Sequence, residues 1–235
     1  MLHASRPHPH NRISLLSRLF HQYPQVMKKS SIDVWVFDLD NTLYPPSARL
    51  FDQIEAKMEG YIIRELGMTR ADAKAMRADF WHNHGTTLEG LVKTYGIDPE
   101  PFLEEVHDID HAILSKSAPL REALLSLNGR RLIYTNGSRK HGEQVSDALG
   151  IRDCFETIYG IEDAGYRPKP HADAFAKVFQ KAGFDPKRAI MFEDDPRNLQ
   201  VPYRLGMQTV LVGSDLKDDH IGHNTHDLAA FLTAL

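Results

Sequence analysis

The pattern of apolar and polar positions divides the chain into two kinds of region. In the second half, short apolar runs of strand length alternate with segments whose apolar residues recur every three to four positions. Together with one run near the start, the predicted strands cover residues 32–37, 131–135, 157–160, 189–193 and 208–212. The helices of this half are predicted at 119–127, 138–149, 171–182 and 196–205. The alternation predicts a parallel sheet with helices on both faces.

A purely helical pattern fills the stretch between the first two predicted strands. Phe51, Ile54, Met58 and Ile62 recur at spacings of three and four, as on the buried face of a helix. No strand signal occurs from residue 48 to 116. Further helices are predicted at 69–82, 86–95 and 99–114. The stretch is therefore expected to form an all-helical insert.

The predicted fold class is α/β, a Rossmann-like parallel sheet core with helices on both faces and an inserted all-helical cap domain. The core is expected to comprise residues 31–47 and 117–235, and the cap residues 48–116. Residues 1–30 show no comparable pattern, and Met27 stands directly before the first predicted strand. We therefore expect residues 1–30 to be a flexible basic tail or a misassigned start.

Composition and charge narrow the classes of function. With 42% hydrophobic and 26% charged residues the chain is globular rather than disordered, and no apolar run reaches the 18 residues of a membrane span. Residues 1–30 carry five basic and no acidic side chains, which leaves 23 basic against 32 acidic in the rest. This acidic body argues against a nucleic acid polymer as partner. The single Cys154 cannot form an internal disulfide, which favours a cytoplasmic location.

The residues that carry chemistry follow the ends of the predicted strands. In open parallel sheets ligands bind beyond these carboxyl ends. Asp38 and Asp40 follow the first strand one residue apart, so both side chains can point to the same side. Two such carboxylates favour a hard divalent cation such as Mg²⁺. Taken alone, they are also typical of a solvated turn.

Two later loops offer groups that bind anions. Thr135 ends the second strand and is followed by backbone N–H groups at a helix entrance, where an anion can bind. As an alternative, Ser138 could serve as the cap of that helix and have no part in anion binding. Lys169 stands between two prolines, and a rigidly presented ammonium suits a phosphoryl oxygen, although a surface lysine is an equal alternative.

Three adjacent acids follow the fourth strand. Glu193, Asp194 and Asp195 would repel one another unless a cation or hydrogen bonds compensate. Asp195 could alternatively cap the next helix. Each of the four motifs alone has a structural explanation, but their order along successive strand ends favours a phosphate site.

These motifs in this order resemble those of the haloacid dehalogenase superfamily of phosphohydrolases, over residues 32 to 213. The run Asp38–Thr42 is similar to the first motif, and Thr135, Lys169 and Glu193–Asp194 to the second, third and fourth. The fourth motif of the family often reads as two aspartates and a serine. Here the acids shift by one residue, which leaves open whether Glu193 or Asp195 also contacts the metal.

Within the superfamily the chain resembles the pyrimidine 5′-nucleotidases. The segments that carry this likeness are Asp38–Tyr44 with Pro45, the helix of Phe51–Gly67, Gly85–Leu88, Val106–Asp110 and Thr135–Gly137. The resemblance implies hydrolysis of pyrimidine nucleoside 5′-monophosphates, small-molecule phosphomonoesters, with Mg²⁺ as cofactor.

The family mechanism implied by this resemblance is a phosphoaspartyl route. Asp38 would attack phosphorus, and Asp40 would protonate the leaving oxygen and then deprotonate water. Mg²⁺ would be held by Asp38, the backbone carbonyl of Asp40 and Asp194. Thr135 and Lys169 would bind the phosphoryl oxygens. Asp40 also argues against a dehalogenase, because a leaving halide needs no proton.

Substrate binding is expected from two further groups. Asn136 and Gly137 would contribute backbone N–H groups to the phosphoryl site, and Thr86 and Thr87 of the cap would contact base or ribose. Further cap candidates are His84, His107 and Asp108. For most of these five cap residues, capping a helix or facing solvent is the favoured alternative. A metal site at His107 with His111 is disfavoured, because no third ligand is evident.

Two alternatives remain open. A phosphatase for another small metabolite, a sugar phosphate or phosphoglycolate, would keep every core residue and differ in the cap. A non-catalytic phosphate-binding regulatory protein could keep the fold without the chemistry. The second alternative is disfavoured because none of the five core residues is lost: Asp38, Asp40, Thr135, Lys169 and Asp194.

Overall fold

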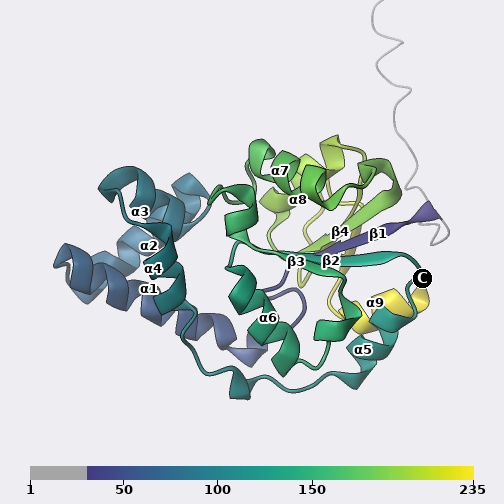
Figure 1. Cartoon of the computed structure of the whole chain (residues 1–235), viewed down its shortest axis with the longest axis horizontal. Coiled ribbons are helices and arrows are strands. Elements are labelled where there is room, and N and C mark those ends of the chain that lie inside the picture. The colour runs from purple at the N-terminus through teal and green to yellow at the C-terminus, as the bar shows by residue number, and fades with distance from the viewer. Residues whose placement is uncertain (1–30) are drawn as a thin grey trace, which may run out of the picture.

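A single parallel sheet of six strands organises residues 31–235, the part of the chain that the computed structural model describes (Figure 1). The expected tail, residues 1–30, lies outside the described residues. The spatial order of the strands is β3-β2-β1-β4-β5-β6. Their bounds are β1 Val34–Phe37, β2 Arg130–Tyr134, β3 Thr157–Tyr159, β4 Ala189–Glu193, β5 Gln208–Val212 and β6 His223–Thr225.

The register of the central strands aligns the predicted motifs. Phe37 of β1 pairs with Ile133 of β2 on one side and with Phe192 of β4 on the other. The backbone N–H of Asp38 continues the ladder by donating to the carbonyl of Phe192 at 2.9 Å. Because parallel strands end at the same edge, the residues that follow β1, β2 and β4 meet beyond that edge.

Alternate residues of the strands pack on opposite faces of the sheet, as a pleated backbone requires. Trp35 and Phe37 belong to one apolar cluster, which they share with residues of α5 (Ala118–Leu125), α6 (Arg139–Ala148) and α9 (Leu228–Ala234). Val34 and Val36 belong to the other, shared with α7 (Ala172–Ala182) and α8 (Pro196–Arg204). Figure 1 shows these two helical layers on either side of the sheet. The α/β sandwich is therefore as predicted.

Four helices between β1 and β2 form the cap. They are α1 (Leu50–Leu66), α2 (Arg70–His84), α3 (Thr87–Tyr95) and α4 (Pro99–Val106). Their apolar faces share a core of their own, with Ile54, Ile62, Phe80, Leu91 and Phe102 among its buried members. Gly90 allows the close crossing of α2 and α3, since a Cβ there would lie 2.2 Å from the ring of Phe80. In Figure 1 the cap lies to the left of the sheet.

The predicted helix over residues 99–114 is wrong in its second half. α4 ends at Val106, and a separate 3₁₀ turn covers His111–Ile113. The side chain of Gln53 fixes the break, because it donates to the carbonyl of Asp110 and accepts from its N–H, both at 3.0 Å. Asp110 then caps the turn by accepting from the N–H of Ala112 at 2.8 Å.

Two other elements were not expected from the sequence. β6 consists of His-Asn-Thr, all three partly exposed. Because none of these residues is apolar, the hydrophobic pattern does not predict this strand. α9 follows it at the end of the chain and buries Leu228 and Leu232 against the core. Within residues 31–235, no helix is both long and apolar enough to cross a lipid bilayer.

Candidate active site

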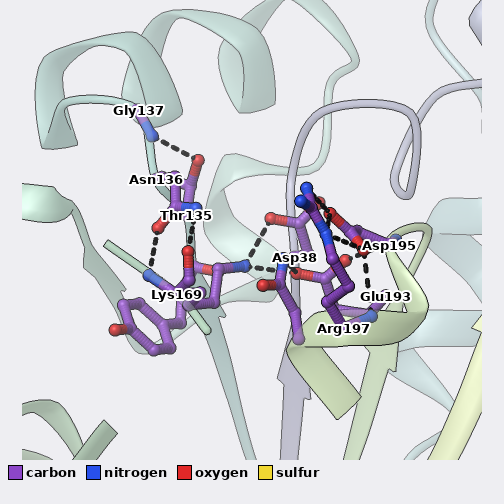
Figure 2. A network of polar contacts seen from close by, with 10 residues as sticks. Asp38, Thr135, Asn136, Gly137, Lys169, Glu193, Asp195 and Arg197 are labelled. Carbon is purple, nitrogen blue, oxygen red and sulfur yellow. Dashed lines mark hydrogen bonds and ion pairs between the residues drawn. The ribbon is translucent and has the colours of Figure 1, made fainter. Parts of the chain in front are cut away.

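A buried ion network lies where β1, β2 and β4 end. The ammonium of Lys169 donates to Asp38 Oδ1 at 2.8 Å, to Glu193 Oε1 at 2.6 Å and to the carbonyl of Tyr134 at 3.0 Å. Figure 2 shows this ammonium between the two carboxylates. Lys169 is only 1% exposed and Asp38 6%. A charge this deeply buried needs such a full set of partners.

The electrostatics of this network keep Lys169 charged. Burial alone would lower the pKa of the ammonium, but Asp38 and Glu193 reverse the effect and raise the pKa above its ordinary value. The backbone around Lys169 is fixed as well. The side chain of Asn136 accepts from the Lys169 N–H at 2.8 Å and donates to the Lys169 carbonyl at 3.1 Å. The loop after β2 thus holds the backbone of Lys169 in place through the side chain of Asn136.

Thr135 and Gly137 form a turn after β2, at the place where phosphate binding is expected from the sequence. Thr135 is 1% exposed, and its Oγ1 accepts from the N–H of Gly137 at 2.9 Å. A Cβ on Gly137 would lie 3.0 Å from the ring of His141, so any larger residue in this turn would require that ring to shift. Ser138 accepts from the N–H of His141 at 3.1 Å and is therefore the N-cap of α6.

The three acids at the end of β4, of which Glu193 is the last residue of the strand, have three different surroundings. Glu193 accepts from Lys169, from Asn198 Nδ2 at 2.7 Å and from the N–H of Asp195 at 2.8 Å. Asp195 caps α8 by accepting from the N–H of Arg197 at 2.9 Å, and it also pairs with the Arg197 guanidinium at 2.6 Å. Asp194 lies near Asp38, the first residue after β1. The structure therefore gives Asp195 the helix-capping role.

One oxygen each of Asp38, Glu193 and Asp194 lies within 4.8 Å of the others. Burial, together with the negative charges of its neighbours, raises the pKa of Asp194 to about 9. Burial also raises the pKa of Asp38 to about 7, against the lowering effect of Lys169. Three carboxylates face one ammonium, so another cation would stabilise their ionised forms. Hard oxygen donors of this kind fit Mg²⁺.

The carboxylate of Asp40 lies outside this acidic group. Its Oδ1 accepts from the hydroxyl of Tyr44 at 2.6 Å and pairs with Nε2 of His141 at 2.9 Å. Burial alone would raise the pKa of Asp40, but His141 and the two hydrogen bonds hold it below its usual value. The side chain of Asp40 is not a member of the clustered acids, and the metal contact expected of Asp40 is the one through its backbone carbonyl.

Sequence reasoning missed both partners of Asp40. The burial of His141 could have been predicted from the sequence. This residue precedes the buried Val145 and Leu149 at intervals of four residues and so falls on the apolar stripe of α6. A histidine on a buried stripe needs a polar partner inside the protein. The contact of Tyr44 could not have been predicted, since a tyrosine in a turn is common and its hydroxyl direction cannot be read from sequence.

A cavity of about 420 Å³ opens between these strand ends and the cap. Asp38, Asp40, Thr135 and Asp194 line its core side. The cap side is largely apolar, with Phe51, Ile54, Met58, Trp81, Leu88, Phe102, Leu103 and Val106 in its wall. The cavity therefore joins a charged floor to an apolar roof.

The expected cap residues divide into two groups. Thr86, Thr87 and His107 line the cavity, whereas His84 and Asp108 do not. Both threonine hydroxyls already have protein partners. Thr86 Oγ1 accepts from the N–H of Glu89 at 3.1 Å, and Thr87 Oγ1 donates to the carbonyl of Arg77 at 3.3 Å.

An ion pair in the roof was not expected from the sequence. Arg77 Nη1 donates to Glu55 Oε1 at 2.5 Å, and Arg77 Nε donates to Glu59 at 3.3 Å. Arg77 and Glu55 both line the cavity. Arg77 is the one lysine or arginine among the described lining residues, and its charge is already compensated by two glutamates.

The histidines near the cavity do not form a metal site. The rings of His107 and His141 stack with centroids 4.3 Å apart, and His107 Nδ1 bonds to the hydroxyl of Ser138 at 3.1 Å. Burial lowers the pKa of His107 to about 3. Among residues 31–235, Asp38, Glu193 and Asp194 are the one group of three clustered ligands.

A buried glutamate joins the cap to the loop of Lys169. Glu89 of α3, 5% exposed, accepts from His171 Nε2 at 2.7 Å and pairs with Arg167 and with Lys93, the latter at 2.8 Å. Arg167 and His171 stand two residues before and after Lys169. The contacts of Glu89 therefore join the cap to the loop that carries Lys169.

Comparison with known proteins adds sequence relatives. Phosphate metabolism protein 8 of Saccharomyces cerevisiae is 26% identical over 199 residues, which cover 76% of this chain and 60% of the yeast protein. Fructose-1-phosphate phosphatase YqaB of Escherichia coli is 26% identical over 119 residues, which cover 48% of this chain and 63% of the bacterial protein. The chain thus spans about three fifths of the length of both relatives.

Solved structures share the fold, and a family model covers most of the chain. An HAD phosphatase from Thermococcus onnurineus aligns with a TM-score of 0.60 at 17% identity over 86% of this chain and 97% of that one. The magnesium-bound HAD-hydrolase YfnB of Bacillus subtilis aligns with a TM-score of 0.54 at 16% identity over 87% and 98%. Residues 32–201 match the family model. The chain belongs to the haloacid dehalogenase-like hydrolases.

Proposed function

We propose that this hydrolase is a Mg²⁺-dependent phosphomonoesterase that acts on pyrimidine nucleoside 5′-monophosphates through a phosphoaspartyl intermediate. The observation that carries the proposal is the arrangement of Asp38, between the ammonium of Lys169 and the carboxylate of Asp194, at the floor of a cavity that Asp40 also lines. Asp38, Asp40 and Asp194 thus face one space, and the buried ammonium of Lys169 is bonded to Asp38 directly behind it.

In the first step Asp38 attacks the phosphorus. A bond forms between a carboxylate oxygen of Asp38 and phosphorus, and the bond from phosphorus to the 5′-oxygen breaks. Asp40 gives a proton to that oxygen, so the nucleoside leaves as a neutral alcohol. Because His141 and Tyr44 hold the pKa of Asp40 low, this role requires the negative charge of the bound phosphate to raise that pKa. Lys169 and the turn of Thr135 and Gly137 neutralise the charge on the phosphoryl oxygens.

In the second step water releases the phosphate. Asp40, now ionised, takes a proton from the attacking water, which forms a new bond to phosphorus. The bond from phosphorus to Asp38 breaks, and the carboxylate of Asp38 is regenerated together with inorganic phosphate. Atoms and charges balance without any oxidant or reductant.

Asp38, Asp194 and the backbone carbonyl of Asp40 would hold Mg²⁺. The bound cation would shield the negative phosphate from the carboxylates that must approach it. Glu193 is already committed to Lys169 and Asn198, so it orients the network. The magnesium in the structural relative from Bacillus subtilis supports this choice of ion.

The roof of the cavity supports a neutral leaving group with an apolar face. The one arginine among the described lining residues is compensated by Glu55 and Glu59, so a carboxylate or second phosphate on the substrate would find no open cation there. Phe51, Met58 and Trp81 offer apolar surface to a planar base. The preference for pyrimidines rests on the resemblance of the cap sequence to the pyrimidine 5′-nucleotidases.

A sugar phosphate remains the second candidate substrate, because the Escherichia coli relative is named a fructose-1-phosphate phosphatase. One experiment separates the two. Phosphate release is measured with and without Mg²⁺ from UMP, CMP, dTMP, AMP, GMP, fructose 1-phosphate and phosphoglycolate, with Asp38→Asn as the control. We expect Mg²⁺-dependent turnover that is fastest on the pyrimidine nucleotides. Fastest turnover of a sugar phosphate would overturn the nucleotide assignment, and no turnover of any substrate would overturn the phosphatase.

A further inference from the structure

Asp40 is held by one oxygen only. The hydroxyl of Tyr44 lies 2.6 Å and Nε2 of His141 lies 2.9 Å from the same atom, Oδ1. Among the described residues, no hydrogen bond is made to Oδ2. Asp40 also lines the cavity. Its two oxygens therefore have different surroundings, one fixed by the protein and one available to a substrate.

The imidazole of His141 is fixed on several sides. It is 0% exposed, its ring stacks on that of His107 with an interplanar angle of 12°, and its edge lies against Gly137, where a Cβ would come within 3.0 Å. Ser138 holds its backbone N–H. The ring therefore cannot turn away from Asp40 without repacking its neighbours.

The other ring nitrogen shows that packing alone does not explain this histidine. Nδ1 of His141 is buried and has no hydrogen-bond partner. Leaving a buried polar atom unpaired costs stability, and an apolar side chain in this place would avoid that cost. Tyr44, 3% exposed, likewise brings a polar group into an apolar cluster. What both residues gain is the contact with Asp40.

We infer that Tyr44 and His141 are positioning residues for the acid–base step, an inference that rests on the proposed function. By sequestering Oδ1 they place the transferable proton of Asp40 on Oδ2, toward the leaving oxygen. That proton passes from Oδ2 to the leaving oxygen as the bond from phosphorus to that oxygen breaks and the bond to Asp38 forms. Oδ2 recovers a proton from water in the second step.

The test compares substrates that differ in their need for a proton. A nucleoside leaving as an alkoxide needs one, whereas p-nitrophenolate does not. The variants Tyr44→Phe, His141→Gln and His141→Leu are assayed for kcat/KM on UMP and on p-nitrophenyl phosphate, because kcat/KM reports transfer to Asp38 and not the later hydrolysis. Where UMP is not a substrate, the fastest alkyl phosphate of the panel above replaces it.

We expect kcat/KM for the alkyl phosphate to fall by roughly 10- to 100-fold in Tyr44→Phe and in His141→Leu, part of the usual contribution of a general acid. Activity on p-nitrophenyl phosphate should fall less than about threefold. His141→Gln, which keeps a donor, should recover part of the loss. Tyr61→Phe, which removes the hydroxyl of a buried tyrosine in the cap core, is the matched control and should leave both activities unchanged.

A double-mutant cycle excludes a merely structural role. In an Asp40→Asn background, Tyr44→Phe should cause no further loss on the alkyl phosphate, since its effect passes through Asp40. Equal losses on both substrates, or additive losses in the cycle, would overturn the inference while the wild type remains an active phosphatase. A wild type inactive on every phosphomonoester would overturn the proposed function and the inference with it. If His141→Leu does not fold, Tyr44→Phe and the cycle still decide.

Discussion

The floor and the roof of the cavity are built by different physical means. On the floor, Asp38 and Glu193 are buried charges at the ends of the adjacent strands β1 and β4. The ammonium of Lys169, from the loop before α7, joins them by contacts of 2.8 and 2.6 Å. The roof consists of apolar side chains from the helices of the cap. The register of the sheet leaves the floor little freedom. The apolar side chains of the roof can be substituted one at a time without disturbing the floor.

This contrast separates chemistry from selectivity. Removing one partner from a buried charge network leaves the other charges uncompensated, so variation on the floor is costly. Apolar wall positions tolerate substitutions of similar volume. We therefore expect floor variants to abolish turnover of every substrate, and roof variants to change which substrate is preferred.

The largest effect is expected on the floor, from Asp38→Asn. The amide is nearly isosteric but cannot act as the nucleophile, so kcat should fall by more than about 10³-fold on all phosphomonoesters alike. Phosphate release measures the loss, and circular dichroism checks that the fold is kept. Retained activity on any one substrate would show that the chemistry does not depend on the floor alone.

The next effect concerns the charge on the floor. Burial and mutual repulsion raise the pKa of Asp38 to about 7 and of Asp194 to about 9 in the folded protein without metal, from an ordinary value of 3.8. The folded state then binds more protons than the unfolded state between about pH 4 and 9. Without Mg²⁺, the free energy of unfolding should therefore decrease as the pH rises through this range.

Mg²⁺ should counteract this loss, because it stabilises the ionised carboxylates. At pH 8 and saturating Mg²⁺ we expect the melting temperature to rise by about 5–10 °C, and by less at pH 5. Asp194→Asn should remove most of the shift. Asp195→Asn is the matched control, since Asp195 caps α8 and should leave the Mg²⁺ shift intact. A shift that does not depend on pH, or that survives Asp194→Asn, would argue against this metal site.

A smaller effect is expected in the roof, from the double variant Glu55→Gln/Glu59→Gln. It frees the charge of Arg77 toward the cavity. The ratio of kcat/KM for phosphoglycolate to that for UMP should rise roughly threefold to tenfold, because the carboxylate of phosphoglycolate gains a cation. Glu65→Gln/Glu105→Gln is the matched control, since it also deprives a cap arginine, Arg64, of two carboxylate partners, but outside this cavity. An unchanged ratio would mean that the roof does not select by charge.

The same contrast explains what the sequence could predict. Five strands and the α/β class follow from apolar periodicity, and Asp38, Thr135, Lys169 and Asp194 stand directly at strand ends or between prolines, where local sequence is informative. The partners of Asp40 and Arg77 were missed, because His141 is 101 residues from Asp40 and Glu55 is 22 from Arg77. Such pairs depend on tertiary packing. β6 was missed because its residues are polar.

Trapping the covalent intermediate tests the central claim most directly. The protein is mixed with UMP and Mg²⁺, or with the best substrate of the panel, quenched in acid within a single turnover, reduced with borohydride and digested for mass spectrometry. The account predicts that reduction converts the acyl phosphate at Asp38 to homoserine, in the peptide that carries this residue and in the wild type but not in Asp38→Asn. Turnover without any modified Asp38, or modification of another carboxylate, would contradict it.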